Sequence, residues 1–215
     1  GPLPLVWTRS YRSSACGRDR GLGHGWSRPL TETLSIDGEQ AHLLDAEGRT
    51  LPFPLPAVGG RSHNLAEGLT LIRPALNAYC VTTTGGGGLE RHFEAPAAAE
   101  QAENAVAASQ ALLMSLRDAS SNRLTLQYEH NLPTRIDTSA GRSLALDYDA
   151  GGRLTRIAEL IPGAEPDLRV EYQYDAAGDL VAVLDPAGDG ERYAYANHLI
   201  ARRTLASGYS FHFEW

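Results

Sequence analysis

The motif Tyr-Asp-x-x-Gly-x-Leu occurs twice in this chain, as "YDAGGRL" at 148–154 and as "YDAAGDL" at 174–180. Alternating apolar residues precede each copy, with Leu144 and Leu146 before the first. Because alternate residues of a strand share one face, each copy begins where a half-buried strand ends. The aspartate can accept backbone N–H groups from the residues that follow, and the glycine can adopt positive φ. The motif therefore predicts a tight turn that reverses the chain into a second antiparallel strand.

Each position of the motif has a structural role in this prediction. The tyrosine ends the incoming strand, packs flat on its neighbours and keeps its hydroxyl in water, while the leucine opens the return strand. Because that hydroxyl has no chemical task, we expect Tyr148→Phe to be mild. A third turn is predicted at 185–188, where proline presets φ at the second position. The predicted repeat and turn residues are Tyr148, Asp149, Gly152, Leu154, Tyr174, Asp175, Gly178, Leu180, Asp185, Pro186 and Gly188.

The motif belongs to a longer series in the C-terminal half of the chain. The aligned tyrosines Tyr128, Tyr148, Tyr174 and Tyr195 lie 20, 26 and 21 residues apart. An imperfect repeat of this length is typical of an array built from one supersecondary unit. The fold class is therefore predicted as all-β, with antiparallel hairpin repeats that form a curved sheet.

Three segments are predicted along the chain. Residues 1–95 alternate short strands with Asp-Gly and glycine-rich turns and form a β region that precedes the repeats. Residues 96–111, "PAAAEQAENAVAASQA", are alanine-rich and lack an apolar stripe, so they predict a short exposed helix or loop inserted between strands. Residues 112–215 hold an incomplete repeat array, with strand structure restarting at 112.

Composition argues against several classes of function. The net charge is −7 and the acidic residues are scattered, which argues against a nucleic-acid partner. No stretch approaches the ~20 apolar residues of a membrane span, and no cleaved signal peptide is expected. Cys16 and Cys80 stand far apart without a CxxC pattern. Two separate thiols are favoured, and a disulfide between them stays open as the alternative.

No pattern in the sequence indicates catalysis or metal binding. The seven histidines are scattered without the spacing of a zinc site, and no nucleophile motif of the type G-x-S-x-G is present. We therefore predict no catalytic residue, no metal ligand and no cofactor, and the sequence identifies no binding residue. The stretch "YSFHFEW" places four aromatic residues on one face, which predicts a cover: the inner wall of a closed sheet, the next turn of an array or a partner. A neighbour beyond the C-terminus is the favoured cover. The four aromatic residues are Tyr209, Phe211, Phe213 and Trp215.

These motifs resemble those of the Rhs/YD-repeat family, whose units read approximately Y-D-x-x-G-R-L. "YDAGGRL" matches at every position, and "YDAAGDL" departs at Asp179. A related turn, "DASSN" at 118–122, has Ser121 in place of the usual glycine, so Asn122 is expected to take the left-handed conformation. "PLPLVWTRSYRS", "GLGHGW" and "LLDAEGRTLPFP" resemble the blocks that precede such repeats in bacterial Rhs proteins. The resemblance covers nearly the whole chain.

The resemblance implies a β-sheet that spirals into a hollow cocoon around a C-terminal toxin domain. Many such proteins are type VI secretion effectors in interbacterial competition. This chain would be a fragment of such a protein, from the pre-repeat region to the first repeats, and a structural shell segment without catalysis. Its implied partners are the rest of the shell and the enclosed toxin, with a secretion spike, adaptor or chaperone as further candidates. It would reside in the bacterial cytoplasm before export through a contractile secretion machine.

Three alternatives remain open. The chain could be a carbohydrate- or protein-binding module, which exposed aromatic residues at 209–215 would favour. It could be a shell component of an insecticidal toxin complex, another role that the resemblance implies. It could also be a self-cleaving protease with Asp185 as its one candidate. The family's cleavage block resembles P-x-x-x-x-D-P-x-G-L, and here Leu180 and Asp189 replace its first and last residues. The turn prediction for Asp185 is therefore preferred.

Overall fold

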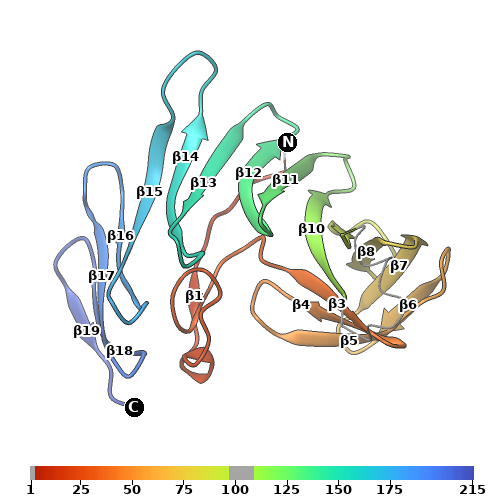
Figure 1. Cartoon of the computed structure of the whole chain (residues 1–215), viewed down its shortest axis with the longest axis horizontal. Coiled ribbons are helices and arrows are strands. Elements are labelled where there is room, and N and C mark those ends of the chain that lie inside the picture. Colours follow the sequence, from red (N-terminus) through yellow and green to blue (C-terminus); the bar gives the residue numbers. More distant parts are fainter. Residues whose placement is uncertain (1–2, 97–108) are drawn as a thin grey trace. The chain divides into compact units, whose positions relative to one another are not determined.

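The computed structural model describes residues 3–96 and 109–215, and antiparallel strands dominate it (Figure 1). Within this part of the chain, the single 3-10 turn η1 (Ser13–Ala15) is the one helical element. The predicted all-β fold class is confirmed. The described residues divide into two compact units that are interleaved in sequence. Unit 1 lies within Gly1–Val6, Pro29–Gln127 and Asp137–Gly141, and unit 2 comprises Trp7–Arg28, Tyr128–Ile136 and Arg142–Trp215.

Unit 1 contains a closed antiparallel sheet. Its strands follow chain order, and each one hydrogen-bonds to the next. Closure comes from β10, which pairs with β9 and also with β3 at the end of the sheet. The strands are β3 (Thr33–Asp37), β4 (Gln40–Leu44), β5 (Thr50–Pro54), β6 (Arg61–Asn64), β7 (Leu69–Ala75), β8 (Ala78–Thr83), β9 (Glu90–Glu94) and β10 (Ser109–Arg117), followed by β11 (Arg123–Glu129).

The interior of unit 1 is formed because buried apolar residues alternate with exposed residues along these strands. In β5, Leu51 and Phe53 are buried, whereas Pro52 and Pro54 are exposed. Burying one large apolar side chain stabilises a fold by about 1.5–3 kcal/mol. The large side chains that are completely buried in this unit are Leu34, Leu43, Phe53, Leu71, Val81, Phe93, Leu113 and Leu126.

The strand that closes unit 1 begins earlier than the sequence predicts. The expected restart is at 112, but β10 starts at Ser109. Ala111 is fully buried and stands opposite Leu34 in the β10–β3 ladder. The strand therefore includes the last residues of the alanine-rich stretch, because alanine content does not separate a helix from a tightly packed strand. Residues 97–108 of the helix or loop predicted for 96–111 lie outside the described residues.

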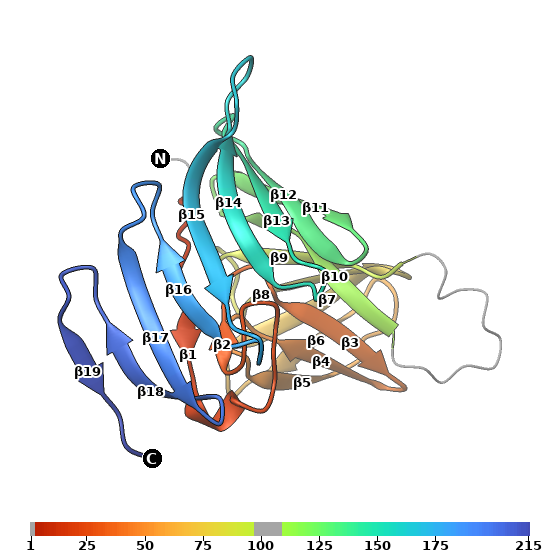
Figure 2. The same cartoon turned by 60° about the vertical axis from the view of Figure 1, so that its left-hand side comes forward.

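Unit 2 combines a meander of antiparallel strands with an N-terminal segment (Figure 2). From β13 onward, each strand pairs with the next one in sequence. The N-terminal residues contribute a separate two-stranded sheet of β1 (Ser10–Tyr11) and β2 (Trp26–Ser27). The other strands are β12 (Leu132–Thr138), β13 (Ser143–Tyr148), β14 (Leu154–Leu160), β15 (Asp167–Tyr174), β16 (Leu180–Leu184), β17 (Gly190–Ala196), β18 (Leu199–Thr204) and β19 (Ser210–His212).

A β-bulge recurs at the same place in three hairpins of unit 2. The register between paired strands shifts immediately before Tyr148, Tyr174 and Tyr195. A bulge sets two residues opposite one, which bends the strand and increases its right-handed twist. Each repeat tyrosine therefore marks the point at which its hairpin bends.

Each compact unit is made of residues that contact one another, and it combines segments that are far apart in the sequence. Trp7–Arg28, which lies in the predicted pre-repeat region, belongs to the same unit as the repeats. We call Trp7–Arg28 the N-terminal strap. The division into 1–95, 96–111 and 112–215 stays a prediction. The described parts of the chain contain no helix with the length and apolar character that crossing a bilayer requires.

Candidate functional site

The repeat turns are held by their aspartate carboxylates. Asp149 Oδ1 accepts the N–H of Gly151 at 2.8 Å and that of Arg153 at 2.9 Å, and Oδ2 accepts from Arg153 Nε at 2.8 Å. Gly152 has a φ of 78°, in the left-handed region. Burial acts to raise the pKa of Asp149, but the hydrogen bonds from Arg153 outweigh it and hold the pKa below its ordinary value. The carboxylate is therefore ionised at neutral pH and committed to the turn.

The second motif copy and the predicted third turn have the same geometry. In each, the aspartate carboxylate accepts the N–H groups two and four residues further on, at 2.9–3.0 Å. The glycine three residues after the aspartate has a φ of 84° in both turns. These residues are Asp175 and Gly178 in the second copy, and Asp185 and Gly188, with Pro186 between them, in the third turn.

The turn at 118–122 corrects one expectation. Ser121, and not Asn122, adopts the left-handed conformation, with a φ of 65°. Asn122 instead donates from its side chain to Asp118 Oδ2 at 2.8 Å, as Arg153 does to Asp149. The prediction for Asn122 was wrong because the geometry of the turn, more than residue preference, selects the position with positive φ.

The repeat tyrosines form a partly buried series of hydrogen bonds, which we call the tyrosine row. In each bond, an aromatic side chain donates to a backbone carbonyl near the start of an earlier strand. The hydroxyl of Tyr148 donates to the carbonyl of Pro133 at 2.8 Å, that of Tyr174 to Leu154 at 2.6 Å, and that of Tyr195 to Leu180 at 2.7 Å. Trp215 Nε1 likewise donates to the carbonyl of Ile200 at 2.9 Å. The motif tyrosine of one repeat is thereby bonded to the repeat before it.

The tyrosine hydroxyls are therefore not in water, and that part of the prediction was wrong. Burial raises the pKa of Tyr148, Tyr174 and Tyr195 above the ordinary value of 10. The hydroxyls stay protonated at neutral pH and act as hydrogen-bond donors. The sequence carries no local signal for these bonds, because the partners lie 15 or 20 residues apart.

Tyr148→Phe is expected to lower the free energy of unfolding by about 1–3 kcal/mol, in contrast to the mild effect expected from sequence alone. The hydroxyl donates to Pro133 O at 2.8 Å and accepts from Arg28 at 3.2 Å, so its removal takes one bond from each partner. Denaturant unfolding would measure the loss. Tyr209→Phe is the matched control, because Tyr209 is 63% exposed. Equal effects of the two substitutions would argue against the tyrosine row.

The N-terminal strap bonds directly to tyrosines of the repeat sheet. Three of these bonds join Trp7 Nε1 to Tyr172 at 3.0 Å, Trp26 Nε1 to Tyr195 at 2.9 Å, and Arg28 to Tyr148 at 3.2 Å. Tyr148 and Tyr195 thus accept from the strap while they donate to repeat carbonyls. The strap and the tyrosine row therefore share one hydrogen-bond network.

Glycines let the strap backbone contact the backbone of the repeats. The carbonyl of Gly21 accepts the N–H of Leu154 at 2.9 Å. A Cβ on Gly23, whose φ is +85°, would lie 2.9 Å from Leu180 N and 3.1 Å from Gly178 O. Backbone atoms cannot rotate aside as the end of a flexible side chain can. The glycines of "GLGHGW" therefore have a packing role that the sequence alone did not reveal.

An ion-pair cluster links the strap to β17 and β18. Glu191 pairs with Arg9 of the strap at 2.8 Å and with Arg203 at 2.6 Å. The hydroxyl of Tyr193 also donates to Glu191. Burial acts to raise the pKa of Glu191, but hydrogen bonds, led by that from Arg203, outweigh it and lower the pKa to about 2. These groups and Trp26 line a cavity of about 460 Å³ in unit 2.

Glu191 is expected to make the stability of the chain depend on pH between about 4.5 and about 2. Folding lowers its pKa from 4.5, so its contribution is present above pH 4.5 and is lost as the pH falls toward 2. The midpoint of urea unfolding, compared at about pH 7 and about pH 3, should fall further for the unaltered chain than for Glu191→Gln. Glu165→Gln, at an exposed loop position, is the control and should keep the full pH dependence. An unchanged pH dependence in Glu191→Gln would refute the assignment.

The position at which "YDAAGDL" departs from its family pattern connects the second turn to the strap. Asp179 is 3% exposed, and its Oδ1 lies 2.9 Å from His198 Nδ1. The ring of His198 stacks on that of His24 in the strap, with the centroids 3.8 Å apart. In the first motif copy the same position is Arg153, which pairs with the turn carboxylate of Asp149.

The aromatic residues at 209–215 form an exposed surface, which we call the aromatic surface. Tyr209, Phe211, Phe213 and Trp215 are 63%, 42%, 41% and 64% exposed. Within residues 3–96 and 109–215, no segment covers these side chains completely, and the nature of their cover stays a prediction. The aromatic surface is therefore a candidate binding face, although the indole N–H of Trp215 belongs to the tyrosine row.

The turns, the bulged hairpins and the tyrosine row form a series of equivalent, hydrogen-bonded hairpins. Comparison with known proteins shows what the chain is similar to. A family model described as "Domain of unknown function (DUF6531)" matches residues 1–53, which include the whole strap.

Two curated toxins are similar to the chain along its whole length. The chain is 27% identical over 217 residues to double-stranded DNA deaminase toxin A of Burkholderia cenocepacia. It is also 27% identical over 256 residues to toxin protein Tse5 of Pseudomonas aeruginosa. The matches cover 100% of this chain and 14% and 19% of the two relatives. The chain is thus related to a segment of Rhs-type toxins.

Proposed function

We propose that this chain is a structural shell segment of an Rhs-type effector, which encapsulates a C-terminal toxin domain for delivery by type VI secretion in interbacterial competition. The observation that carries the proposal is the tyrosine row, in which successive repeats bond through equivalent donor and acceptor positions. Arrays that depend on contacts between neighbouring repeats can be lengthened by adding repeats. A sheet of this kind can therefore form the wall of a container.

We further propose a role beside a toxin and not as the toxin itself. Both relatives are toxins by name, and the chain spans 14% and 19% of their lengths. We infer that the toxic activity resides outside this segment and that the segment is not an enzyme. The protonated tyrosines and the turn carboxylates fit a structural role, because their hydrogen bonds hold strands and turns together.

The proposed partners follow from the shell role. They are the rest of the shell and the enclosed toxin, with a secretion spike, adaptor or chaperone as further candidates. Before export through a contractile machine, the protein would reside in the bacterial cytoplasm. The net charge of −7 agrees with a segment that has no nucleic-acid partner.

Limited proteolysis of the full-length protein that contains this chain tests the encapsulation. We expect the C-terminal toxin domain to resist protease in the intact protein and to be digested when it is expressed by itself. A substitution that displaces the strap should increase digestion, whereas a surface substitution should not. Equal digestion of the toxin domain in the intact protein and by itself would rule out encapsulation.

A second candidate function, carbohydrate or protein binding, rests on the aromatic surface. The rings of Tyr209 and Phe211 meet edge to face at 5.0 Å, and those of Phe213 and Trp215 stack at 6.3 Å. Exposed aromatic side chains of this kind can anchor a partner. Retention of the chain on immobilised polysaccharide, lost in Phe211→Ser, would favour this function. An absence of retention would count against carbohydrate binding.

A further inference from the structure

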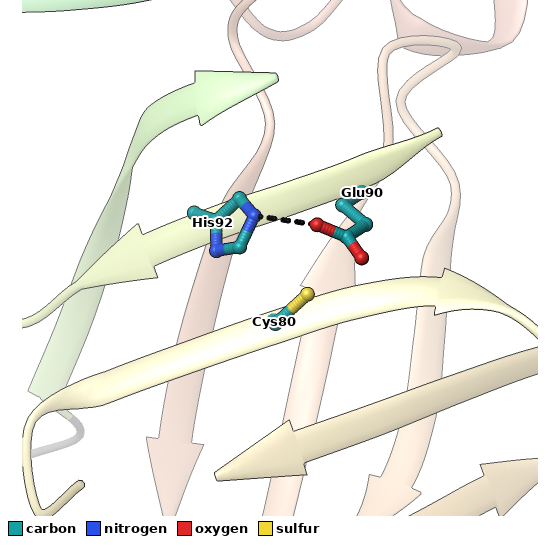
Figure 3. A group of neighbouring side chains, drawn as sticks. All are labelled: Cys80, Glu90 and His92. Atoms are coloured by element: carbon teal, nitrogen blue, oxygen red, sulfur yellow. Dashed lines mark hydrogen bonds and ion pairs between the residues drawn. The ribbon is translucent and has the colours of Figure 1, made fainter. Parts of the chain in front are cut away.

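Three side chains that the sequence left unassigned come together on the sheet of unit 1 (Figure 3). Cys80 of β8 stands directly opposite His92 of β9 in the antiparallel ladder. Glu90 precedes His92 by two residues, so the alternation of the strand places both on the same face. Figure 3 shows the three side chains gathered where two neighbouring strands run side by side, with Cys80 on one strand and Glu90 and His92 on the other.

The donor atoms of these side chains are close enough to share one metal ion. The sulfur of Cys80, a carboxylate oxygen of Glu90 and a ring nitrogen of His92 all lie within 4.8 Å of one another. Glu90 Oε2 and His92 Nε2 are 3.1 Å apart. In a tetrahedral zinc site with bonds of about 2.0–2.3 Å, ligand atoms lie roughly 3.3–3.8 Å apart. Small side-chain rotations would therefore complete the site while the strands keep their register.

The cluster is accessible from solvent on one side. Cys80 is 7% exposed, whereas the side chains of Glu90 and His92 are 41% and 38% exposed. An ion can therefore reach the carboxylate and the imidazole, and water can supply a fourth ligand. The buried thiol would form the floor of the site.

The donor set selects the class of metal. Sulfur and imidazole nitrogen suit zinc and neighbouring transition metals, whereas Mg²⁺ and Ca²⁺ prefer oxygen ligands. Burial raises the pKa of Cys80 to about 11, and the nearby charge of Glu90 adds to the rise. The thiol is therefore protonated without metal, and a bound cation would displace that proton. The raised pKa also disfavours a catalytic cysteine, which requires a lowered thiol pKa.

We propose that Cys80, Glu90 and His92 bind a zinc-class divalent cation, with water as the fourth ligand. The ion would join β8 to β9 within the closed sheet of unit 1. The site is independent of the proposed shell role, because none of its residues belongs to the tyrosine row or the strap. Cys16, the second thiol of the chain, is also free, so it provides a matched control.

Cobalt(II) binding to the chelator-treated chain tests this proposal. A thiolate bound to Co²⁺ gives a charge-transfer absorption in the near ultraviolet, and tetrahedral coordination gives strong bands in the visible range. We expect both signals to saturate at one ion per chain and to disappear when Zn²⁺ is added. Cys80→Ser should abolish the charge-transfer band, and His92→Gln should weaken binding, while Cys16→Ser should keep both signals.

Three results would overturn the proposal: no thiolate band, a band that survives in Cys80→Ser, or unchanged binding in His92→Gln. Zn²⁺ should also raise the melting temperature of the unaltered chain and of Cys16→Ser, but not that of Cys80→Ser. Melting in the presence of chelator shows whether each variant folds. If Cys80→Ser does not fold, the rate at which Cys80 is alkylated in the unaltered chain, measured with and without Zn²⁺, provides the test instead. Protection of Cys80 by Zn²⁺ supports the site, and an unchanged alkylation rate overturns it.

Discussion

Gly23→Val is expected to displace the N-terminal strap and to lower the free energy of unfolding by about 3–5 kcal/mol. The φ of Gly23 is +85°, which valine adopts only with strain. The added Cβ would lie 2.9 Å from Leu180 N and 3.1 Å from Gly178 O. Because both are backbone atoms of a repeat turn, relief requires the strap to move away. That movement would also break the bonds from the strap to the tyrosine row.

Two other glycines in the same unit serve as controls that distinguish the effect of backbone strain from the effect of the steric contact at Gly23. Gly208 has a φ of +84°, but no atom lies within 4 Å of its Cβ position. Gly17, in the strap itself, has neither a positive φ nor an atom within 4 Å. Thermal unfolding should show a much larger loss for Gly23→Val than for Gly208→Val or Gly17→Val. A loss no larger than that of Gly208→Val would mean that the strap does not pack closely on the repeats.

Trp26→Ala should lower the free energy of unfolding by a similar amount, about 3–5 kcal/mol. Trp26 is 6% exposed and donates to the hydroxyl of Tyr195 at 2.9 Å. Its ring centroid lies 5.4 Å from that of Tyr11 and 5.0 Å from that of Tyr193. Truncation would remove buried apolar area, leave a cavity and take a donor from the tyrosine row. Denaturant unfolding at constant pH measures the total effect.

Two further substitutions divide the effect of Trp26→Ala into its causes. Trp26→Phe keeps an aromatic ring but removes the indole N–H, so it should cost about 1–2 kcal/mol. Trp215→Ala removes a tryptophan that is 64% exposed and should cost less than Trp26→Ala. Equal losses for Trp26→Ala and Trp215→Ala would show that burial in the strap adds nothing to the stability of the unit.

The strap gives a physical reason for the sequence blocks that precede the repeats. The family match at 1–53 contains the strap, and the strap bonds to tyrosines at 148, 172 and 195. The two regions therefore form one unit although a long stretch of chain separates them. We expect the strap and the repeats to unfold together, so a probe in either region should report the same transition.

The sequence by itself determined the local structure of the repeats. The turn bonds of Asp149 reach no further than Arg153, and Gly152 supplies the positive φ next to them. Because all the partners lie within four residues, the chemistry of the turn can be recognised in the sequence. The alternation of apolar residues likewise predicts strands, and with them the all-β class. Ser121 shows the limit of this reasoning, since the turn imposes positive φ there without a glycine.

Only the tertiary structure decided what the repeats contact. Trp7 and Tyr172 are 165 residues apart, and Trp26 and Tyr195 are 169 residues apart. Cys80 and His92 become neighbours only through the register of two strands. Whether a tyrosine hydroxyl meets water or a carbonyl depends on which distant segment covers it. No local pattern encodes that choice, because it is made by the packing of the whole unit.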